Sequence, residues 1–285
     1  MTALNQKTPV RIDDLSLVSL RISAYFKDVE LALGTAFIYV HEGQPYFITN
    51  WHNVTGRDPT TLKCLHKDVA LPDRLQIKIP YQGQDDSGAR WVQWHLHMMP
   101  LYEDEGESPM KSIWYEHPEH RHNVDVVAIP FDGEESGIQP ANDPILNLAK
   151  IRLRPSLDVF VLGFPRGMSG GANFPVWKRG SIASEPDIDI DGLPKIFIDT
   201  ATREGMSGSP VYAEDVGFVM PEGVTEVGDA LIGRAKRFLG IYSGRIGADD
   251  DFKTQLGIVW KPAAIEEIIQ GAMYGTSSFE ICPKS

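Results

Sequence analysis

Ser207 lies in a short turn-like segment whose residue types suit a serine nucleophile, Gly205-Met206-Ser207-Gly208-Ser209-Pro210. A serine hydroxyl is a weak nucleophile until a neighbouring base takes its proton, and a neutral imidazole can do so because the unperturbed histidine pKa is about 6.5. All eight histidines lie before residue 123, so a base for Ser207 must come from the N-terminal half. Asp125 opens an apolar run between them and could orient such a histidine.

The chain order His, Asp, Ser separates the known ways of activating a serine. An α/β-hydrolase carries its histidine after its serine, and no histidine follows Ser207 here. The subtilisin order needs an aspartate before the histidine, which Asp13, Asp14 or Asp28 could supply ahead of His52. That fold also needs alternating helices and parallel strands, which the periodicity of this chain does not support.

His52 is the preferred base among the eight histidines. It follows the strand-like run Tyr46-Phe47-Ile48-Thr49-Asn50-Trp51, so we expect its ring to project from a strand end. The others fall in a turn, in a polar loop, on one face of a strand, or in a short cluster: His41, His66, His95 with His97, and His117 with His120 and His122. The cluster could bind a metal ion adventitiously, but it lacks a partnering cysteine and a helical register, so no functional metal site is expected.

Short apolar or alternating runs, broken by Gly, Pro, Asn and Asp, predict strands and turns along most of the chain. The expected fold class is therefore all-β. The strand candidates are Leu15–Phe26, Ala32–Val40, Tyr46–Thr49, Leu75–Ile79, Trp91–Met98, Asp125–Phe131, Asp158–Gly163, Lys195–Asp199, Ser209–Tyr212, Phe238–Tyr242 and Leu256–Trp260.

One helix is expected near the end of the chain. Pro262 suits a first helical turn, and four apolar residues follow on one face: Ile265, Ile268, Ile269 and Met273. The Gly-, Pro- and acid-rich stretch Asp132–Asn147 predicts a boundary near residue 140, giving an N-terminal unit 1–140 and a C-terminal unit 141–285. Long polar surface loops are expected within 81–122 and over Asp215–Ala230.

The composition points to a compact protein of one unit or two closely packed units. A formal charge of −12 and a pI near 5.1, without any Lys/Arg block, disfavour binding to nucleic acid or an anionic membrane. The first residues show no signal-peptide core and no run reaches membrane-spanning length, so a cytoplasmic location is expected. Cys64 and Cys282 are therefore expected to stay reduced, and no cofactor is expected.

Five segments together resemble the trypsin-like serine peptidases, in style closest to the HtrA/DegP-like bacterial members. The run from Phe47 to Val54 resembles the strand-plus-His motif, the run from Val124 to Ile129 the Asp motif, and the run from Gly205 to Pro210 the nucleophile motif. Val161–Gly167 followed by Arg179–Ser184 is similar to the second barrel of HtrA-like members, and Leu239–Gly244 to the substrate-pairing strand. The five occur in the family's order.

That resemblance implies two six-stranded antiparallel β-barrels, a chymotrypsin-like double barrel, with the site in the cleft between them. His52, Asp125 and Ser207 would be the base, its orienting carboxylate and the nucleophile of a serine endopeptidase acting on proteins or peptides through an acyl-enzyme. The backbone N–H groups of Gly205 and Ser207 would form the oxyanion hole. The residues implied to bind substrate are Ala201, Thr202, Ser243, Gly244 and Arg245. Because Ala201 carries no charge, an uncharged residue is expected before the cut.

Two departures from the family pattern leave the activation mechanism open. Met206 stands where the family usually has Asp or Asn, and no Ile-Val-type processed N-terminus is evident. A switched-off resting form, with a regulatory protein partner, is one reading of these departures. A PDZ-like module after residue 275 is not expected. The alternatives are a protease-like binding or scaffold module with a relaxed triad, and a non-peptidic acyl hydrolase.

Overall fold

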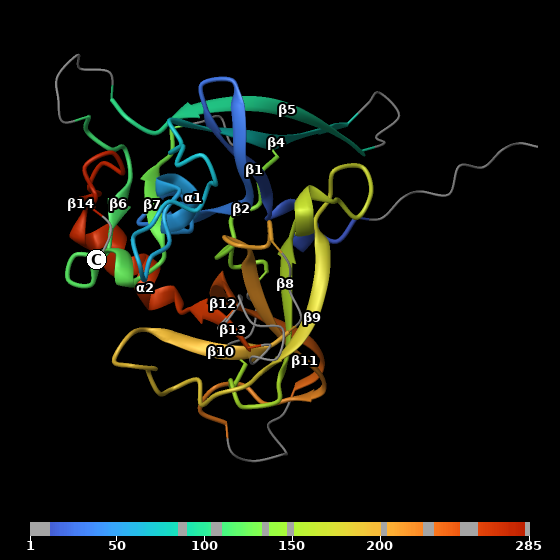
Figure 1. Cartoon of the computed structure of the whole chain (residues 1–285). Helices are drawn as coiled ribbons and strands as arrows, with labels where there is room; N and C mark the ends of the chain where they lie inside the picture. The colour runs from blue at the N-terminus through green and yellow to red at the C-terminus, as the bar shows by residue number, and fades with distance from the viewer. Residues whose placement is uncertain are drawn as a thin grey trace, which may run out of the picture.

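A computed structural model describes residues 12–84, 90–103, 110–132, 137–146, 151–200, 204–224, 231–245 and 256–282. Two antiparallel sheets form the molecule, with a helix near the C-terminus (Figure 1): seven strands of the first sheet come from the first half of the chain and one, β14, from its end, and the second sheet comes from the second half. The expected all-β class with a terminal helix is confirmed. The boundary near residue 140 stays a prediction.

The first sheet contains eight strands instead of the six expected in a barrel. Their hydrogen-bonded order is β14-β6-β7-β3-β2-β1-β4-β5, and the two extra strands, β6 and β14, are only two residues long. The strands are β1 (Leu20–Phe26), β2 (Val29–His41), β3 (Gln44–Thr49), β4 (Arg74–Gln84), β5 (Arg90–Pro100), β6 (Tyr115–Glu116), β7 (Val127–Pro130) and β14 (Met273–Tyr274).

The turn between β2 and β3 illustrates how local sequence sets the register of this sheet. Glu42 and Gly43 both adopt positive φ, 51° and 82°, which is the two-residue hairpin turn that matches strand twist. His41 consequently pairs with Gln44, and Phe37 pairs with Ile48. The hairpin turn expected beside His41 is therefore present.

The second sheet is a closed barrel of six strands in the order β10-β13-β12-β11-β8-β9. β11 and β12 extend beyond the barrel as a long hairpin, so part of the polar insertion expected over Asp215–Ala230 is strand. The strands are β8 (Asp158–Gly163), β9 (Val176–Ile182), β10 (Lys195–Asp199), β11 (Pro210–Val219), β12 (Leu231–Arg245) and β13 (Leu256–Trp260).

The two α-helices each differ in part from the sequence expectation. His52 lies on a short helix, α1 (Trp51–Thr55), and not on a strand end; Gly56 ends that helix in the left-handed conformation (φ 66°), its N–H donating to the His52 carbonyl. α2 (Pro262–Gly271) begins at Pro262 as predicted and buries Ile265, Ile268 and Ile269. Met273, however, lies in β14 and is exposed, because Ala272 turns the chain out of the helix.

Other sequence expectations also need correction. The segment Leu15–Phe26 begins as a 3-10 turn, η1 (Asp14–Leu17), because the Asp13 carboxylate accepts the Leu15 N–H and caps it. Part of the loop expected after residue 81 is strand, since β4 runs to Gln84. The sequence pattern does not predict β6, β9 or β14. Two further 3-10 turns are η2 (Arg121–Asn123) and η3 (Pro165–Gly167).

Three clusters of buried side chains hold the molecule together. One lies within the first sheet and another, which includes Met206, lies inside the second barrel. The third joins the two halves: Phe37 of β2, Leu162 of β8, Phe238 of β12 and Ile265 of α2 belong to it. Burial of this shared apolar surface fixes the two sheets relative to each other.

The segment after α2 returns to the first sheet and anchors it. The buried Glu116 carboxylate accepts hydrogen bonds from the Trp51 indole (3.0 Å) and from the Thr276 N–H (3.1 Å). Arg57, buried just after α1, donates to the Ser278 carbonyl at 2.9 Å and to the Leu62 carbonyl at 2.8 Å. Both ends of the helix that carries His52 are thus tied to the C-terminal segment.

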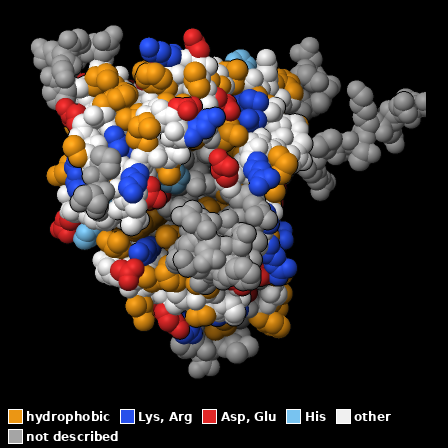
Figure 2. All heavy atoms as spheres, in the orientation of Figure 1, with side chains coloured by type: hydrophobic (Ala, Val, Ile, Leu, Met, Phe, Trp, Pro, Cys, Tyr) orange, Lys and Arg blue, Asp and Glu red, His pale blue; other side chains and the backbone are white. Residues whose placement is uncertain are grey.

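Acidic and basic side chains alternate over the face shown in Figure 2, with apolar side chains among them. Cys64 and Cys282 are both free. In the described part of the chain, we find no helix with the length and apolar character needed to cross a membrane.

Candidate active site

His52 and Asp125 form a close pair at the edge of the first sheet. The His52 ring Nδ1 lies 2.7 Å from Asp125 Oδ2, and the backbone N–H of His52 donates to Asp125 Oδ1 at 2.9 Å. A carboxylate only accepts hydrogen bonds, so Nδ1 carries the proton and Nε2 is left as the basic nitrogen. These two contacts set both the tautomer and the orientation of the ring.

Asp125 is itself held by side chains from both halves. The hydroxyl of Ser243, on β12, donates to Asp125 Oδ2 at 2.5 Å, and the Asn50 side-chain amide donates to the Asp125 backbone carbonyl at 2.6 Å. The Asp125 side chain is almost fully buried, at 4% exposure, whereas His52 is 18% exposed. The carboxylate is therefore fixed, and the imidazole can reach a substrate.

The pKa of His52 reflects two opposing effects. Burial is the largest and lowers the pKa, because it disfavours the imidazolium. The charge of Asp125, its hydrogen bond and the charge of Asp58 raise the pKa, and together they outweigh burial, so the pKa of His52 lies above its usual 6.5. The pair is thus arranged to stabilise a proton taken up by His52.

Ser207 lies across from His52, on the loop that precedes β11. Both side chains border one cavity of about 450 Å³, which Leu33 of β2, Leu65 and Glu204 also line. The structure therefore brings the three predicted residues of the triad to one place. Among the described residues no hydrogen bond joins Ser207 to His52, a contact that often forms only when substrate is bound.

Each carbonyl group from residue 204 to residue 207 accepts a hydrogen bond. The donors are the Arg166 N–H to Glu204 (2.7 Å), the Thr35 hydroxyl to Gly205 (2.9 Å), the Ser209 N–H to Met206 (3.1 Å) and the Thr35 N–H to Ser207 (2.8 Å). In a trans peptide the C=O and the following N–H point in opposite directions. The bonds at Glu204 and Met206 therefore direct the N–H groups of Gly205 and Ser207 away from Arg166 and Ser209.

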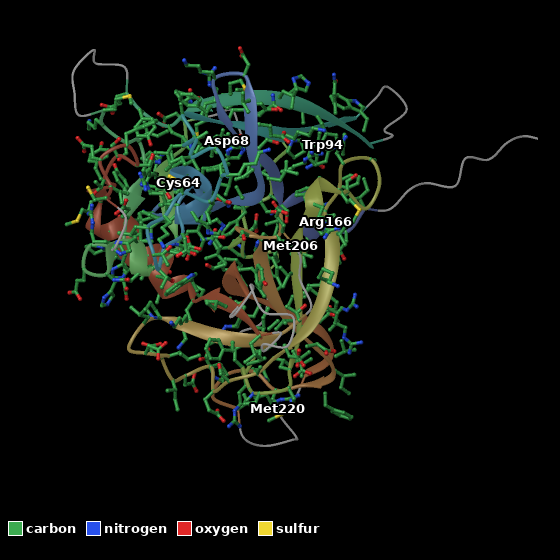
Figure 3. The ribbon with its side chains drawn as sticks, viewed as in Figure 1. Cys64, Asp68, Trp94, Arg166, Met206 and Met220 are labelled. Atoms are coloured by element: carbon green, nitrogen blue, oxygen red, sulfur yellow. The ribbon has the colours of Figure 1, made fainter. Side chains whose placement is uncertain are left out.

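Gly205 is required by the geometry of this loop. Its φ is +87°, and a Cβ at this position would lie 2.4 Å from the Phe164 carbonyl oxygen. Met206, the departure from the family pattern, is fully buried in the core of the second barrel. Figure 3 labels Met206 and also Arg166, which lies on the η3 turn and whose N–H binds the Glu204 carbonyl. The loop is thus anchored by apolar burial and by backbone hydrogen bonds.

The residues predicted to bind substrate are only partly described. Ser243 and Gly244 line a second cavity of about 700 Å³, together with His52, Asp125 and Trp260. The hydroxyl of Ser243 faces Asp125. Ala201 and Thr202 lie outside the described residues, and so does the side chain of Arg245, which ends β12.

The histidine cluster after β6 makes local contacts. His117 Nε2 donates to Glu267 of α2 at 2.7 Å, while its Nδ1 accepts the backbone N–H groups of Glu119 and His120. Over the described ranges, no group of three or more His, Cys, Asp or Glu residues could hold a metal ion. His117 therefore connects β6 to α2.

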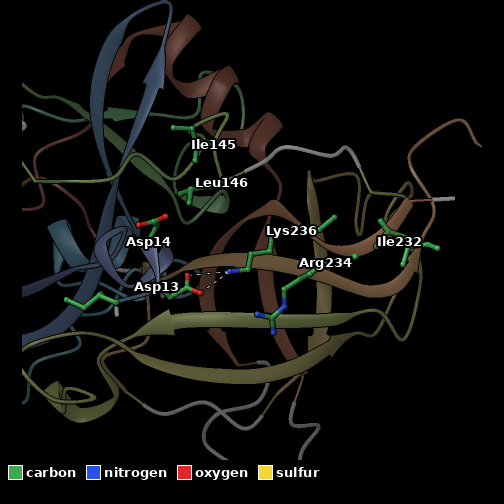
Figure 4. Close-up of a pocket in the computed structure, with 11 residues that line it drawn as sticks. Asp13, Asp14, Ile145, Leu146, Ile232, Arg234 and Lys236 are labelled. Carbon is green, nitrogen blue, oxygen red and sulfur yellow. Dashed lines mark hydrogen bonds and ion pairs between the residues drawn. The ribbon is translucent and has the colours of Figure 1, made fainter. Parts of the chain in front are cut away.

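A third cavity, of about 560 Å³, lies on the β11–β12 hairpin, where Ile145, Leu146 and Ile232 line it (Figure 4). An ion pair between Lys236 and Asp13, 3.3 Å long, crosses one side. None of the described residues that line it is a serine, cysteine or histidine, so those residues supply no alternative nucleophile and base.

Several residues that support the site are not singled out by the sequence. Thr35, Asn53 and Arg166 all hold the nucleophile loop, Asn53 through its amide on the Ser207 carbonyl at 3.3 Å. Two of these contacts use backbone N–H groups, so the residue types in the sequence do not reveal them. The sequence resemblance predicts that Ser243 binds substrate, but it does not predict the hydrogen bond from Ser243 to Asp125.

Comparison with known proteins gives one family match. The family model described as "Trypsin-like peptidase domain" matches residues 34–219, more than half of the chain, and this segment contains His52, Asp125 and Ser207. No curated protein matches the sequence.

Three similar solved structures share the chain's overall extent at low identity. Rv3671c from M. tuberculosis H37Rv, in an inactive mutant form, is 14% identical with a TM-score of 0.45, covering 90% of this chain and 86% of that one. The serine endoprotease from Yersinia pestis is 12% identical (TM-score 0.47; 93% and 67% covered). The thermostable serine protease AL20, from an extremophilic microorganism, is 11% identical (TM-score 0.43; 90% and 97% covered).

Proposed function

Because this chain belongs to the trypsin-like peptidase family, we propose that it is a serine endopeptidase that cuts proteins through His52, Asp125 and Ser207. The observation that carries the proposal is the His52–Asp125 pair, with Nδ1 and Oδ2 2.7 Å apart, on the same cavity as Ser207. All three residues fall within the segment that the family model matches.

Acylation begins when Ser207 Oγ attacks the carbonyl carbon of the scissile bond and His52 Nε2 takes the hydroxyl proton. Asp125 stabilises the imidazolium that forms, because it accepts the Nδ1 proton in a hydrogen bond. The negative charge moves to the carbonyl oxygen, where the N–H groups of Gly205 and Ser207 receive it. The bonds on the Glu204 and Met206 carbonyls support this role, since they orient those two N–H groups.

The tetrahedral intermediate then collapses and the C–N bond breaks. His52 gives its proton to the leaving amine, and the acyl group stays as an ester on Ser207. In the second half, water attacks this ester, His52 accepts the water proton, and the returning proton restores the Ser207 hydroxyl. The raised pKa of His52 supports this proton cycle, because the ring must hold the proton between the two steps.

The substrate is proposed to be a protein or peptide that lies across the two cavities on either side of His52. The cavity with Ser243 and Gly244 receives the acyl side, and the cavity with Leu33 and Leu65 receives the leaving side. An uncharged residue before the cut, a cytoplasmic location and a regulatory partner stay predictions of the sequence.

Hydrolysis of an unbiased peptide library, read by mass spectrometry, tests the proposal. Ser207→Ala should lower kcat/KM by at least about 10⁴-fold, because the nucleophile is lost. Ser209→Ala is the matched control: it removes a buried hydroxyl, two residues away in the same loop, for which the described residues provide no hydrogen-bond partner. Equal hydrolysis by the wild type and by Ser207→Ala would contradict the proposal.

A further inference from the structure

Thr35 of β2 bridges the first sheet to the nucleophile loop of the second barrel with two hydrogen bonds. Its backbone N–H donates to the Ser207 carbonyl at 2.8 Å, and its hydroxyl donates to the Gly205 carbonyl at 2.9 Å. Thr35 has no exposed surface. One residue of the first sheet therefore binds the loop at both positions whose N–H groups face the developing oxyanion in the proposed reaction.

Gly205 lies between two peptide groups that are each held in place. The Arg166 N–H holds the carbonyl before it, at Glu204, and the Thr35 hydroxyl holds its own carbonyl. Glycine has the widest choice of φ and ψ of any residue, so an unrestrained Gly205 could rotate its N–H out of place. Holding both flanking carbonyls leaves one pair of dihedral angles, with φ at +87°.

The neighbours of Thr35 keep its hydroxyl at this position. The Thr49 hydroxyl donates to the Thr35 carbonyl at 2.9 Å. A Cβ at Gly208 would lie 1.9 Å from the Thr35 carbonyl oxygen, and a Cβ at Gly163 would lie 3.0 Å from its Oγ1, so the second barrel approaches Thr35 through two glycines. The Thr35 hydroxyl therefore lies in a close-packed contact between the two halves, and this packing directs it to the Gly205 carbonyl.

We propose that Thr35 is a positioning residue of this peptidase: its hydroxyl holds the Gly205 carbonyl and so fixes the peptide that follows Gly205, while the Arg166 N–H fixes the peptide that carries the Gly205 N–H. Together the two bonds keep Gly205 in the conformation that presents its N–H to the oxyanion. The inference rests on the proposed function. By this inference, a side chain of the first sheet contributes to transition-state stabilisation, because the second barrel alone does not hold the oxyanion N–H groups in place. The loop is then correctly formed only when the two halves are packed together.

Replacing Thr35 by valine is the central test, since valine keeps the shape and the N–H but loses the hydroxyl. We expect kcat of Thr35→Val to fall by about tenfold to hundredfold, somewhat less than the loss of a whole oxyanion donor, while KM stays within about twofold. The probe is a peptide p-nitroanilide whose sequence comes from the library profile of the wild type. Affinity for the peptide aldehyde of the same sequence should fall by the same factor as kcat, because the bound aldehyde carries the oxyanion.

Two control variants separate positioning from stability. Thr35→Ser keeps the hydroxyl and should restore kcat to within about threefold of the wild type, since the hydrogen bond is preserved. Ser19→Ala removes another fully buried hydroxyl bond between the halves, from Ser19 to the Leu162 carbonyl (2.8 Å), which does not involve a carbonyl of the nucleophile loop. It should lower the melting temperature without changing kcat.

The outcomes distinguish this inference from the proposed function. If the wild type hydrolyses the probe but Thr35→Val retains its kcat and its aldehyde affinity, the role of Thr35 is wrong and the peptidase stands. If Thr35→Val does not fold, Thr35→Ser decides the matter: a loss of kcat at unchanged KM, despite the retained hydroxyl, overturns the inference. A wild type that hydrolyses no peptide overturns both.

Discussion

His52 and Asp125 are held by side chains, whereas Ser207 is held through the backbone of its loop. On the first side, Asp125 accepts the His52 ring N–H and the Ser243 hydroxyl, so residue identity specifies each contact. On the second side, the carbonyls of residues 204–207 are all occupied, mostly by backbone N–H groups. The base therefore depends on which residues are present, and the nucleophile loop depends on how the chain is packed around it.

The largest effect should come from Asp125→Asn, which changes the His52–Asp125 pair that is held by side chains. We expect kcat/KM to fall by about 10⁴-fold, because an amide does not enforce the productive tautomer of His52. The pH profile sharpens the test. His52 must be neutral to accept a proton, so activity is lost as pH falls through its pKa, which lies above 6.5 in the wild type.

Removing the Asp125 charge leaves burial as the main influence on the pKa of His52, and burial lowers it. The acid limb of the Asp125→Asn profile should therefore move to lower pH than that of the wild type. A limb at the wild-type position, measured as kcat/KM against pH, would show that Asp125 does not control the base.

Gly205→Ala is the most direct way to disrupt the nucleophile loop, which is held through its backbone. A Cβ there would approach the Phe164 carbonyl oxygen to 2.4 Å at a positive φ, so the loop must shift. We expect kcat to fall by about 10²–10³-fold, the cost of losing one oxyanion donor.

Gly43→Ala is the control for the strain alone, since Gly43 has a similar φ of +82° with no atom close to its missing Cβ. Its kcat should match the wild type. If both alanine variants retain kcat, the oxyanion loop does not need the geometry described above.

A smaller effect is expected at the junction of the two halves, with Ser243→Ala. The hydroxyl donates one hydrogen bond to the Asp125 carboxylate, and losing a bond of about 1.5 kcal/mol corresponds to roughly tenfold in rate. Ser243→Thr keeps the hydroxyl and should retain most of the activity. Equal kcat/KM for Ser243→Ala and the wild type would assign the orientation of Asp125 to the first sheet alone.

The least effect on turnover should follow from Arg57→Leu, which weakens the anchor of the first sheet. Two buried carbonyls, of Leu62 and Ser278, would lose their donor, so the free energy of unfolding should fall by about 2 kcal/mol or more. Urea denaturation measures this loss, and kcat per folded molecule should be unchanged. Arg179→Leu removes only an exposed pair with Asp158 and should change stability less.

The same division explains what could be predicted from the sequence. His52, Asp125, Ser207 and Gly205 could be singled out because each position needs a particular residue type. β8 and β10 were predicted with the bounds they have, since alternation within a closed barrel is regular. The roles of Thr35 and Arg166 could not be foreseen, because they arise from contacts between segments more than thirty residues apart.

Short elements escaped prediction for a related reason. β6 and β14 contain two residues each, too few for any periodicity, and they form because the segment after α2 binds the Glu116 carboxylate. The position of His52 on a helical turn was missed because Gly56, which ends that turn, also suits a loop.

Labelling with a fluorophosphonate, followed by mass spectrometry of the adduct, tests the central claim that the two halves build one reactive serine. The wild type should carry a single adduct on Ser207, and its labelling rate should fall at least about a thousandfold in His52→Ala, because the base is removed. An adduct on another residue, no adduct in the wild type, or an unchanged rate in His52→Ala would contradict it.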